Sequence, residues 1–163
     1  MRSFTALPTV VLAAIISAGC AMPGHHAMHG HHGSAGPKSE VVSTKDAPEA
    51  IGPYSQAIKY GPFVFLAGQI PIDPKTNKLL NEGSIEDQTR LVLENLKAVL
   101  TASGMTMENI VSTSVFLKDM NEFPRMNAVY GTYFKTAPPA RATVEVARLP
   151  RDVKVEISAI AAR

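Results

Sequence analysis

Residues 139–157 read Pro-Ala-Arg-Ala-Thr-Val-Glu-Val-Ala-Arg-Leu-Pro-Arg-Asp-Val-Lys-Val-Glu-Ile and contain two runs of alternating polar and apolar side chains. The runs cover residues 141–146 and 153–158, and a strict period of two over such lengths predicts half-buried β-strands. Residues 147–152 between them hold a proline and charged side chains, which are typical of a tight connection. We therefore expect a β-hairpin here.

An antiparallel register centred between Leu149 and Pro150 matches the two strands by side-chain polarity. It pairs Val146 with Val153, Val144 with Val155, Ala142 with Ile157, Glu145 with Lys154, Thr143 with Glu156 and Arg141 with Ser158. Apolar partners meet on one face and opposite charges on the other, whereas a shift by one residue would oppose polar and apolar side chains. This register places Arg141, Thr143 and Glu156 on one surface of the sheet.

Composition narrows the classes of chemistry that the chain can perform. A length of 163 residues with 45% hydrophobic and 18% charged residues is typical of one globular domain with additional segments. The net charge of +2, without a basic stripe, argues against nucleic acid as a partner. Cys20 is the single cysteine and all five histidines lie between His25 and His32. The remaining sequence therefore has no Ser-His-Asp triad, no cysteine nucleophile and no conventional His/Cys metal site.

The first 19 residues resemble a signal peptide. Ala6 to Ala18 is mostly apolar, and its length suits the core of a signal peptide but not a membrane span. Ser17-Ala18-Gly19-Cys20 resembles the cleavage box of bacterial lipoproteins, with serine where leucine is usual. We expect residues 1–19 to be removed, Cys20 to be lipidated, and the protein to be anchored in the cell envelope through lipid alone. The alternative is an ordinary secretory signal and a soluble exported protein.

Residues 20–37 are rich in Gly, Ala, Met, Pro and His and show no apolar period, so they predict a disordered linker. The clustered histidines are His25, His26, His29, His31 and His32. Such a tract binds Zn, Cu or Ni ions, but a flexible tract lacks the surrounding hydrogen bonds that make a metal site selective. A spacer with incidental metal affinity and an envelope metal buffer both remain open.

Residues 38–163 predict an α+β domain. Strands are expected at 38–44, 50–60, 63–67 and 110–117 besides the C-terminal pair, and helices after Ser84 up to Gly104 and at 122–134, the second capped by Asn121. This order favours a mixed six-stranded sheet with both helices on one face. The other face, which we expect to bear Arg141, Thr143 and Glu156, would be exposed to solvent or closed against copies of the chain.

Several separate motifs over residues 38–163 resemble the RidA/YjgF family of reactive-intermediate deaminases. They are residues 51–56 (IGPYSQ), 67–71 (AGQIP), 88–96 (QTRLVLENL) and 139–146 (PARATVEV), followed by 155–157 (VEI). The resemblance implies a chorismate-mutase-like fold and a homotrimer whose sheets form a central barrel, with clefts at the subunit interfaces. It also implies hydrolysis of 2-imino or enamine acids, such as 2-iminopropanoate and 2-iminobutanoate, to 2-keto acids and ammonia without a cofactor.

The resemblance also implies roles for individual residues. Arg141 matches the carboxylate-binding arginine and Glu156 the glutamate that positions water, and the other cleft positions are Tyr54, Ala67, Gly68, Asn127 and Thr143. Members of the family often have serine at the position of Ala67 and cysteine at that of Thr143, so this chain departs from the pattern twice.

The chemistry of these residue types suits such a reaction. A guanidinium binds a carboxylate through two parallel hydrogen bonds, and a partly desolvated carboxylate with a raised pKa can relay a proton from water. The simpler reading makes Arg141 and Glu156 members of ion pairs on the strand surface, for instance Arg141 with Glu145 or Glu156. A binding module for small carboxylates without catalysis, or a chaperone-like protein, remains an alternative to the deaminase.

Mass spectrometry of the mature N-terminus tests the leader prediction. We expect the mature chain to begin at an acylated Cys20, because residues 17–20 resemble the cleavage box of lipoproteins. The acyl chains would then supply the membrane anchor. A mature chain that begins elsewhere, or an unmodified Cys20, would contradict lipidation.

Overall fold

The computed structural model describes residue 36 and residues 38–163. The predicted signal peptide, the lipidation site Cys20 and the histidine tract His25–His32 lie outside the described residues. Within the described part, no helix combines the length and apolarity needed to cross a membrane.

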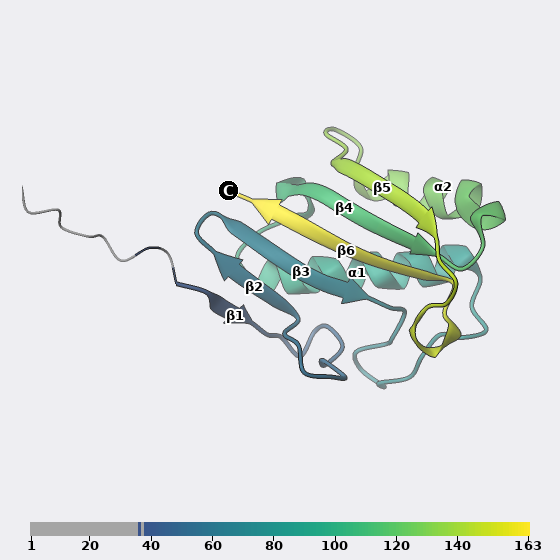
Figure 1. Cartoon of the computed structure of the whole chain (residues 1–163), viewed down its shortest axis with the longest axis horizontal. Coiled ribbons are helices and arrows are strands. Elements are labelled where there is room, and N and C mark those ends of the chain that lie inside the picture. Colours follow the sequence, from purple (N-terminus) through teal and green to yellow (C-terminus); the bar gives the residue numbers. More distant parts are fainter. Residues whose placement is uncertain (1–35, 37) are drawn as a thin grey trace, which may run out of the picture. The chain divides into compact units, whose positions relative to one another are not determined.

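The chain folds into one mixed six-stranded sheet with two helices behind it (Figure 1). The strands are β1 (Glu40–Val42), β2 (Ala57–Tyr60), β3 (Phe63–Gln69), β4 (Ile110–Leu117), β5 (Ala140–Glu145) and β6 (Val155–Ala162), and the helices are α1 (Ile85–Ala102) and α2 (Phe123–Tyr133). Their order across the sheet is β1-β2-β3-β6-β4-β5, and only β4 and β5 pair in parallel. This architecture confirms the predicted fold class.

Helix α1 forms where the pattern of capping and apolar residues predicts it. The Asp87 amide donates to Ser84 Oγ (3.2 Å), which satisfies one of the free donors of the first turn. The buried side of the helix includes Val92, Leu96 and Val99, which pack against the sheet in the main core. Gly104 follows the last turn with a φ of +76°, a conformation that glycine adopts without a steric penalty.

The predicted hairpin is wrong, because β5 and β6 are not neighbours. Strand β4 lies between them, pairing in parallel with β5 and antiparallel with β6. The parallel pair requires a crossover, which α2 provides, whereas the antiparallel pair does not. β6 is a central strand between β3 and β4, and its alternate residues Val155, Ile157, Ala159 and Ala161 are buried in the core.

Smaller differences from the predicted elements have local causes. Asn121 does not cap the second helix: Asp119 accepts a hydrogen bond from the Asn121 amide and caps a short 3-10 turn (Met120–Glu122) that precedes α2. Strand β1 is shorter than residues 38–44, and β2 begins at Ala57 rather than at residue 50. Strand β3 is longer than residues 63–67, and its side chains alternate between exposed and buried over residues 63–66.

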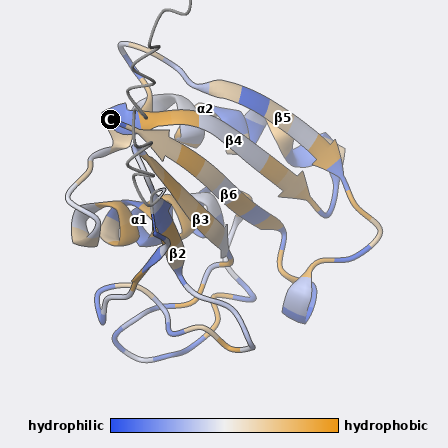
Figure 2. Cartoon of the chain, turned by 60° about the vertical axis from the view of Figure 1, so that its left-hand side comes forward, coloured by the Kyte–Doolittle hydropathy of each residue, from blue (hydrophilic) through white to orange (hydrophobic). Residues whose placement is uncertain are grey.

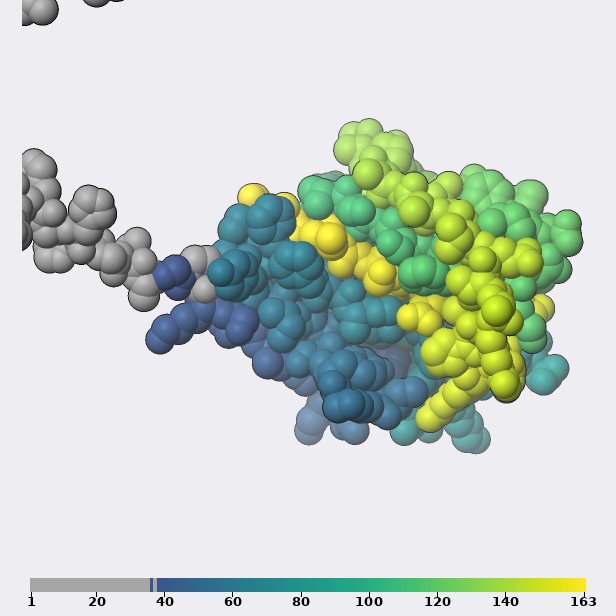
Figure 3. Space-filling view, in the orientation of Figure 1, coloured from purple at the N-terminus to yellow at the C-terminus, as the bar shows by residue number. Residues whose placement is uncertain are grey.

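The sheet face opposite the helices is open and rich in apolar side chains. Phe63 and Phe65 of β3 alternate with the buried Val64, and Val144 of β5 is 45% exposed. Figure 2 shows hydrophobic residues along β3, β6 and β4, and Figure 3 shows β6 reaching the surface between its neighbours with no helix over it. Large exposed apolar surfaces of this kind mark interaction sites.

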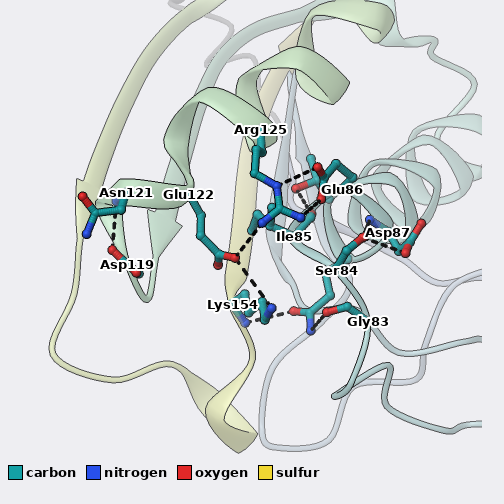
Figure 4. A network of polar contacts seen from close by, with 12 residues as sticks. Gly83, Ser84, Ile85, Glu86, Asp87, Asp119, Asn121, Glu122, Arg125 and Lys154 are labelled. Carbon is teal, nitrogen blue, oxygen red and sulfur yellow. Dashed lines mark hydrogen bonds and ion pairs between the residues drawn. The ribbon is translucent and has the colours of Figure 1, made fainter.

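Polar side chains tie the helices to the start of β6 (Figure 4). Arg125 of α2 donates two hydrogen bonds to Glu86 of α1 (2.7 and 2.8 Å) and lies 3.5 Å from Glu122, which in turn lies 3.6 Å from Lys154. These ion pairs are partly exposed and contribute modestly to stability.

The fully buried Gln88 makes a stronger connection at the same place. Its amide nitrogen donates to the carbonyls of Leu80 (2.8 Å) and Asn81 (3.1 Å), and its oxygen accepts from the Lys154 amide (2.9 Å). The side chain thereby joins the loop before α1 to the segment that enters β6.

Replacing Gln88 with alanine should lower the free energy of unfolding by about 2–4 kcal/mol, because the substitution leaves buried backbone donors and acceptors without partners. Chemical denaturation monitored by circular dichroism measures the change. The exposed Asn121, whose side chain makes no hydrogen bond among the described residues, supplies the control Asn121→Ala. Equal effects of the two substitutions would contradict this role of Gln88.

Candidate active site

Arg141 lies on the helix side of the sheet. Its register partner in β4 is Thr113, and its guanidinium carbon lies 4.5 Å from the ring centroid of Tyr130 and 5.6 Å from that of Phe123, both on α2. Among the described residues no carboxylate lies within ion-pair distance of Arg141, and Glu145 instead accepts a hydrogen bond from the Met120 amide (2.8 Å). The simpler reading of Arg141 as part of a strand-surface ion pair is therefore wrong within this chain.

Thr143 and Asn127 lie near Arg141. Thr143 follows Arg141 by two residues and so faces the same way, and its Oγ1 is buried without a hydrogen-bond partner in residues 38–163. An unpartnered buried hydroxyl is uncommon and calls for a ligand or an ordered water. The exposed Asn127 lies one helical turn after Phe123 and three residues before Tyr130, hence on the same face of α2. We call Arg141, Thr143 and Asn127 the arginine group.

Glu156 lies on the open side of the sheet. It pairs with Phe116 of β4 and alternates with the buried Val155 and Ile157. Its carboxylate packs against Gly68 of β3, so closely that a Cβ atom there would overlap Glu156 Oε1. Burial disfavours the ionised form and raises the pKa of Glu156 above the ordinary glutamate value. No described cation lies within ion-pair distance to offset this shift.

Tyr54 and Ala67 lie close to Gly68 in the chain's N-terminal half, Ala67 as the preceding residue of β3. Tyr54 and Gly68 line one small cavity together with Gln56. The Tyr54 hydroxyl accepts a hydrogen bond from the Ile51 amide (3.3 Å), and Tyr54 is half exposed. The Ala67 amide donates to the Gln56 carbonyl (3.0 Å). We call Glu156, Gly68, Ala67 and Tyr54 the glutamate group.

The prediction that Arg141, Thr143 and Glu156 share one surface is wrong, because Arg141 and Glu156 point to opposite faces. In β4, Thr113 and Val115 are buried on the helix side, and they pair with Arg141 and Thr143 of β5. Phe116 points to the other side and pairs with Glu156 of β6. Successive side chains of a strand point to opposite faces, so the intervening strand sets the two groups apart. One copy of the chain therefore does not bring both groups onto one small substrate.

Sequence reasoning missed the residues that surround Arg141. Phe123 and Tyr130 have the spacing of an apolar stripe in the second helix, and Thr113 lies in the strand at 110–117, so none of the three was assigned a role in the site. A threonine among buried apolar positions and a tyrosine in an apolar stripe are the signals that could have indicated a polar contact between them.

Within the described residues no three His, Cys, Asp or Glu side chains converge on a possible metal position.

Comparisons with known proteins give consistent results. Residues 44–163 match the family model described as Endoribonuclease L-PSP. The RutC family protein PH0854 of Pyrococcus horikoshii is 58% identical over 122 residues, which cover 75% of this chain and 96% of that protein. The 2-iminobutanoate/2-iminopropanoate deaminase of Salmonella typhimurium is 48% identical over 128 residues (77% and 98%). The crystal structure of E. coli TdcF with bound serine is 44% identical with a TM-score of 0.73 (76% and 98%).

The substitution Gly68→Ala should lower the pKa of Glu156 toward the ordinary glutamate value. The added Cβ displaces the carboxylate from its packed position, and a less buried carboxyl ionises more readily. Carboxyl-carbon NMR over a pH titration, with Glu156→Gln to assign the signal, measures the change.

Gly131 in α2 supplies the matched control, because a Cβ there meets nothing within 4 Å. Gly131→Ala should leave the pKa of Glu156 unchanged and stabilise the helix by about 0.5–1 kcal/mol. An unchanged Glu156 pKa in Gly68→Ala would contradict the close packing of these two residues.

Proposed function

Because the chain belongs to the Endoribonuclease L-PSP family, the RidA/YjgF family that its motifs resemble, we propose that it hydrolyses 2-imino and enamine acids to 2-keto acids and ammonia. The Salmonella relative carries the name of that activity, and the TdcF structure holds serine, an amino acid with a carboxylate next to the reacting carbon. Both support a small α-carboxylate as the ligand of this chain.

The observation that carries the proposal is the free guanidinium of Arg141. It is exposed, lies over aromatic rings rather than beside a carboxylate, and has the buried, unpartnered Thr143 hydroxyl two residues away on the same face. A guanidinium whose in-plane donors are available binds a planar carboxylate through two parallel hydrogen bonds. The substrate carboxylate would take that place, and Asn127 and Thr143 would contact the rest of the molecule.

Glu156 would supply the proton transfer. Water adds to the C=N carbon as Glu156 accepts a proton from it and delivers a proton to the nitrogen, which gives a carbinolamine. The C–N bond then breaks, the hydroxyl proton passes through Glu156 to the departing nitrogen, and the products are a keto acid and ammonia. The raised pKa of Glu156 makes its carboxylate a better proton acceptor, as a group that must accept and then return a proton requires. Imines are already electrophilic, so orientation and one proton relay suffice.

We propose further that the site is completed by a second copy of the chain. The arginine group and the glutamate group face opposite sides of the sheet, and the open face exposes Phe63, Phe65 and Val144. Apolar faces of this kind are buried when copies assemble with closed symmetry. In a homotrimer closed around these faces, Arg141 of one copy would meet Glu156 of the next.

Trapping of an imine with semicarbazide tests the activity. An amino-acid oxidase generates 2-iminopropanoate, and the active protein should reduce semicarbazone formation because it hydrolyses the imine before it is trapped. Arg141→Ala and Glu156→Gln should each abolish this reduction. A wild-type protein that binds 2-keto acids but leaves semicarbazone formation equal to that of Arg141→Ala would show a binding module instead.

Mixed assemblies test the shared site. When Arg141→Ala and Glu156→Gln chains are refolded together in equal amounts, about a quarter of the sites should combine an intact Arg141 with an intact Glu156. Activity should therefore return from two inactive parents to about a quarter of the wild-type value. Inactive assemblies that native mass spectrometry shows to be mixed would contradict a site shared between copies.

A further inference from the structure

We propose that Tyr130 is a positioning residue for Arg141, held in place by Thr113, and that its ring sets the direction in which the guanidinium meets the substrate carboxylate. This inference rests on the proposed function and adds to it the means by which the anchor is oriented. It concerns residues that make no contact with the reacting atoms.

Arg141 differs from Arg125, Arg148 and Arg163 of the described domain in how its guanidinium is held. Arg125 pairs with Glu86, Arg148 pairs with Asp152 and Arg163 donates to the carbonyls of Ser103 and Gly104. Each of these guanidinium groups uses its in-plane N–H donors. Arg141 instead lies against two aromatic rings.

A contact with a ring orients the guanidinium without occupying its donors. Cations are attracted to the face of an aromatic ring, and arginine makes this contact through its flat surface. The N–H groups lie in the plane of the guanidinium and so remain available at its edge. An anchor paired with a protein carboxylate would have to exchange that partner for the substrate, whereas an anchor held by a ring is ready to bind.

Thr113 fixes the ring to the same strand that fixes Arg141. The Tyr130 and Thr113 hydroxyl oxygens are 2.7 Å apart, and both residues are buried, at 4% and 2% exposure. Thr113 is also the register partner of Arg141 in the β4–β5 pair. Strand β4 thus positions the backbone of Arg141 through the sheet and its guanidinium through the ring of Tyr130. Burial raises the pKa of Tyr130, while the neighbouring Thr113 hydroxyl and Arg141 guanidinium lower it by a smaller amount.

Steady-state kinetics on the full-length protein test this role. With 2-iminobutanoate as substrate, Tyr130→Leu should raise KM about tenfold and change kcat less than twofold, since the loss falls on binding through Arg141. Because loss of Arg141 abolishes turnover, the double variant is tested by binding of the product 2-oxobutanoate. Tyr130→Leu should raise the Kd of 2-oxobutanoate about tenfold when Arg141 is present and leave it unchanged in an Arg141→Gln background, because the group that it positions is gone. Tyr133→Leu is the matched control: Tyr133 follows in the same helix but bonds to Glu94 (2.8 Å), so its KM should equal that of the wild type.

Two further variants separate positioning from packing. Thr113→Val leaves the Tyr130 hydroxyl buried without a partner and should raise KM about threefold as the ring shifts. Adding Tyr130→Phe removes that hydroxyl while keeping the ring, and should restore KM to within about twofold of wild type. This pair decides the question even if Tyr130→Leu does not fold.

The outcomes distinguish this inference from the proposed function. A rise in the Kd of 2-oxobutanoate on Tyr130→Leu that is equal in the wild-type and Arg141→Gln backgrounds would overturn the positioning role and leave the proposed function intact. So would failure of Tyr130→Phe to rescue Thr113→Val. An unchanged Kd of 2-oxobutanoate in Arg141→Gln alone would overturn both, because Arg141 would not be the substrate anchor.

Discussion

The placement of β4 between β5 and β6 is the constraint on which the other features of the domain depend. β4 pairs in parallel with β5, which requires α2 as a crossover, and in antiparallel with β6, which makes β6 a central strand. The buried side of β6 supplies part of the main core under α1. The same arrangement gives Arg141 an environment of helix side chains and Glu156 an environment of open sheet.

The two faces of the sheet differ in how they are covered and in which charged residue they carry. The helix face has a packed core, and at its edge Arg141 lies on rings with no acidic partner among the described residues. The open face has exposed aromatic side chains and a carboxyl whose pKa is raised by burial alone. Under the proposed function, each face presents one of the two residues that act on the imino acid. A second copy of the chain would supply the other residue to each face, and would also cover the apolar surface.

Much of the fold could be predicted from the sequence, and the errors share one cause. Local signals identified the cap at Ser84, the stripe of α1 and the strand pattern of residues 110–117 correctly. The pairing of residues 141–146 with 153–158 failed although its register satisfied every cross-strand rule. Alternation specifies that a strand has one buried side, but any strand with the same period satisfies it equally well. Alternation also misassigned Val144, which is apolar but faces away from the core.

The sequence by itself determined the residue types of the candidate site, since the domain offers no histidine or cysteine and its motifs single out Arg141 and Glu156. It also determined most helices and strands, because capping and periodicity act over a few residues. Only the tertiary structure decided which strands are neighbours, on which faces the two charged residues lie, and that Thr113 and Tyr130 lie beside the arginine. Those relations join segments far apart in the chain, and their energy comes from packing that no local pattern records.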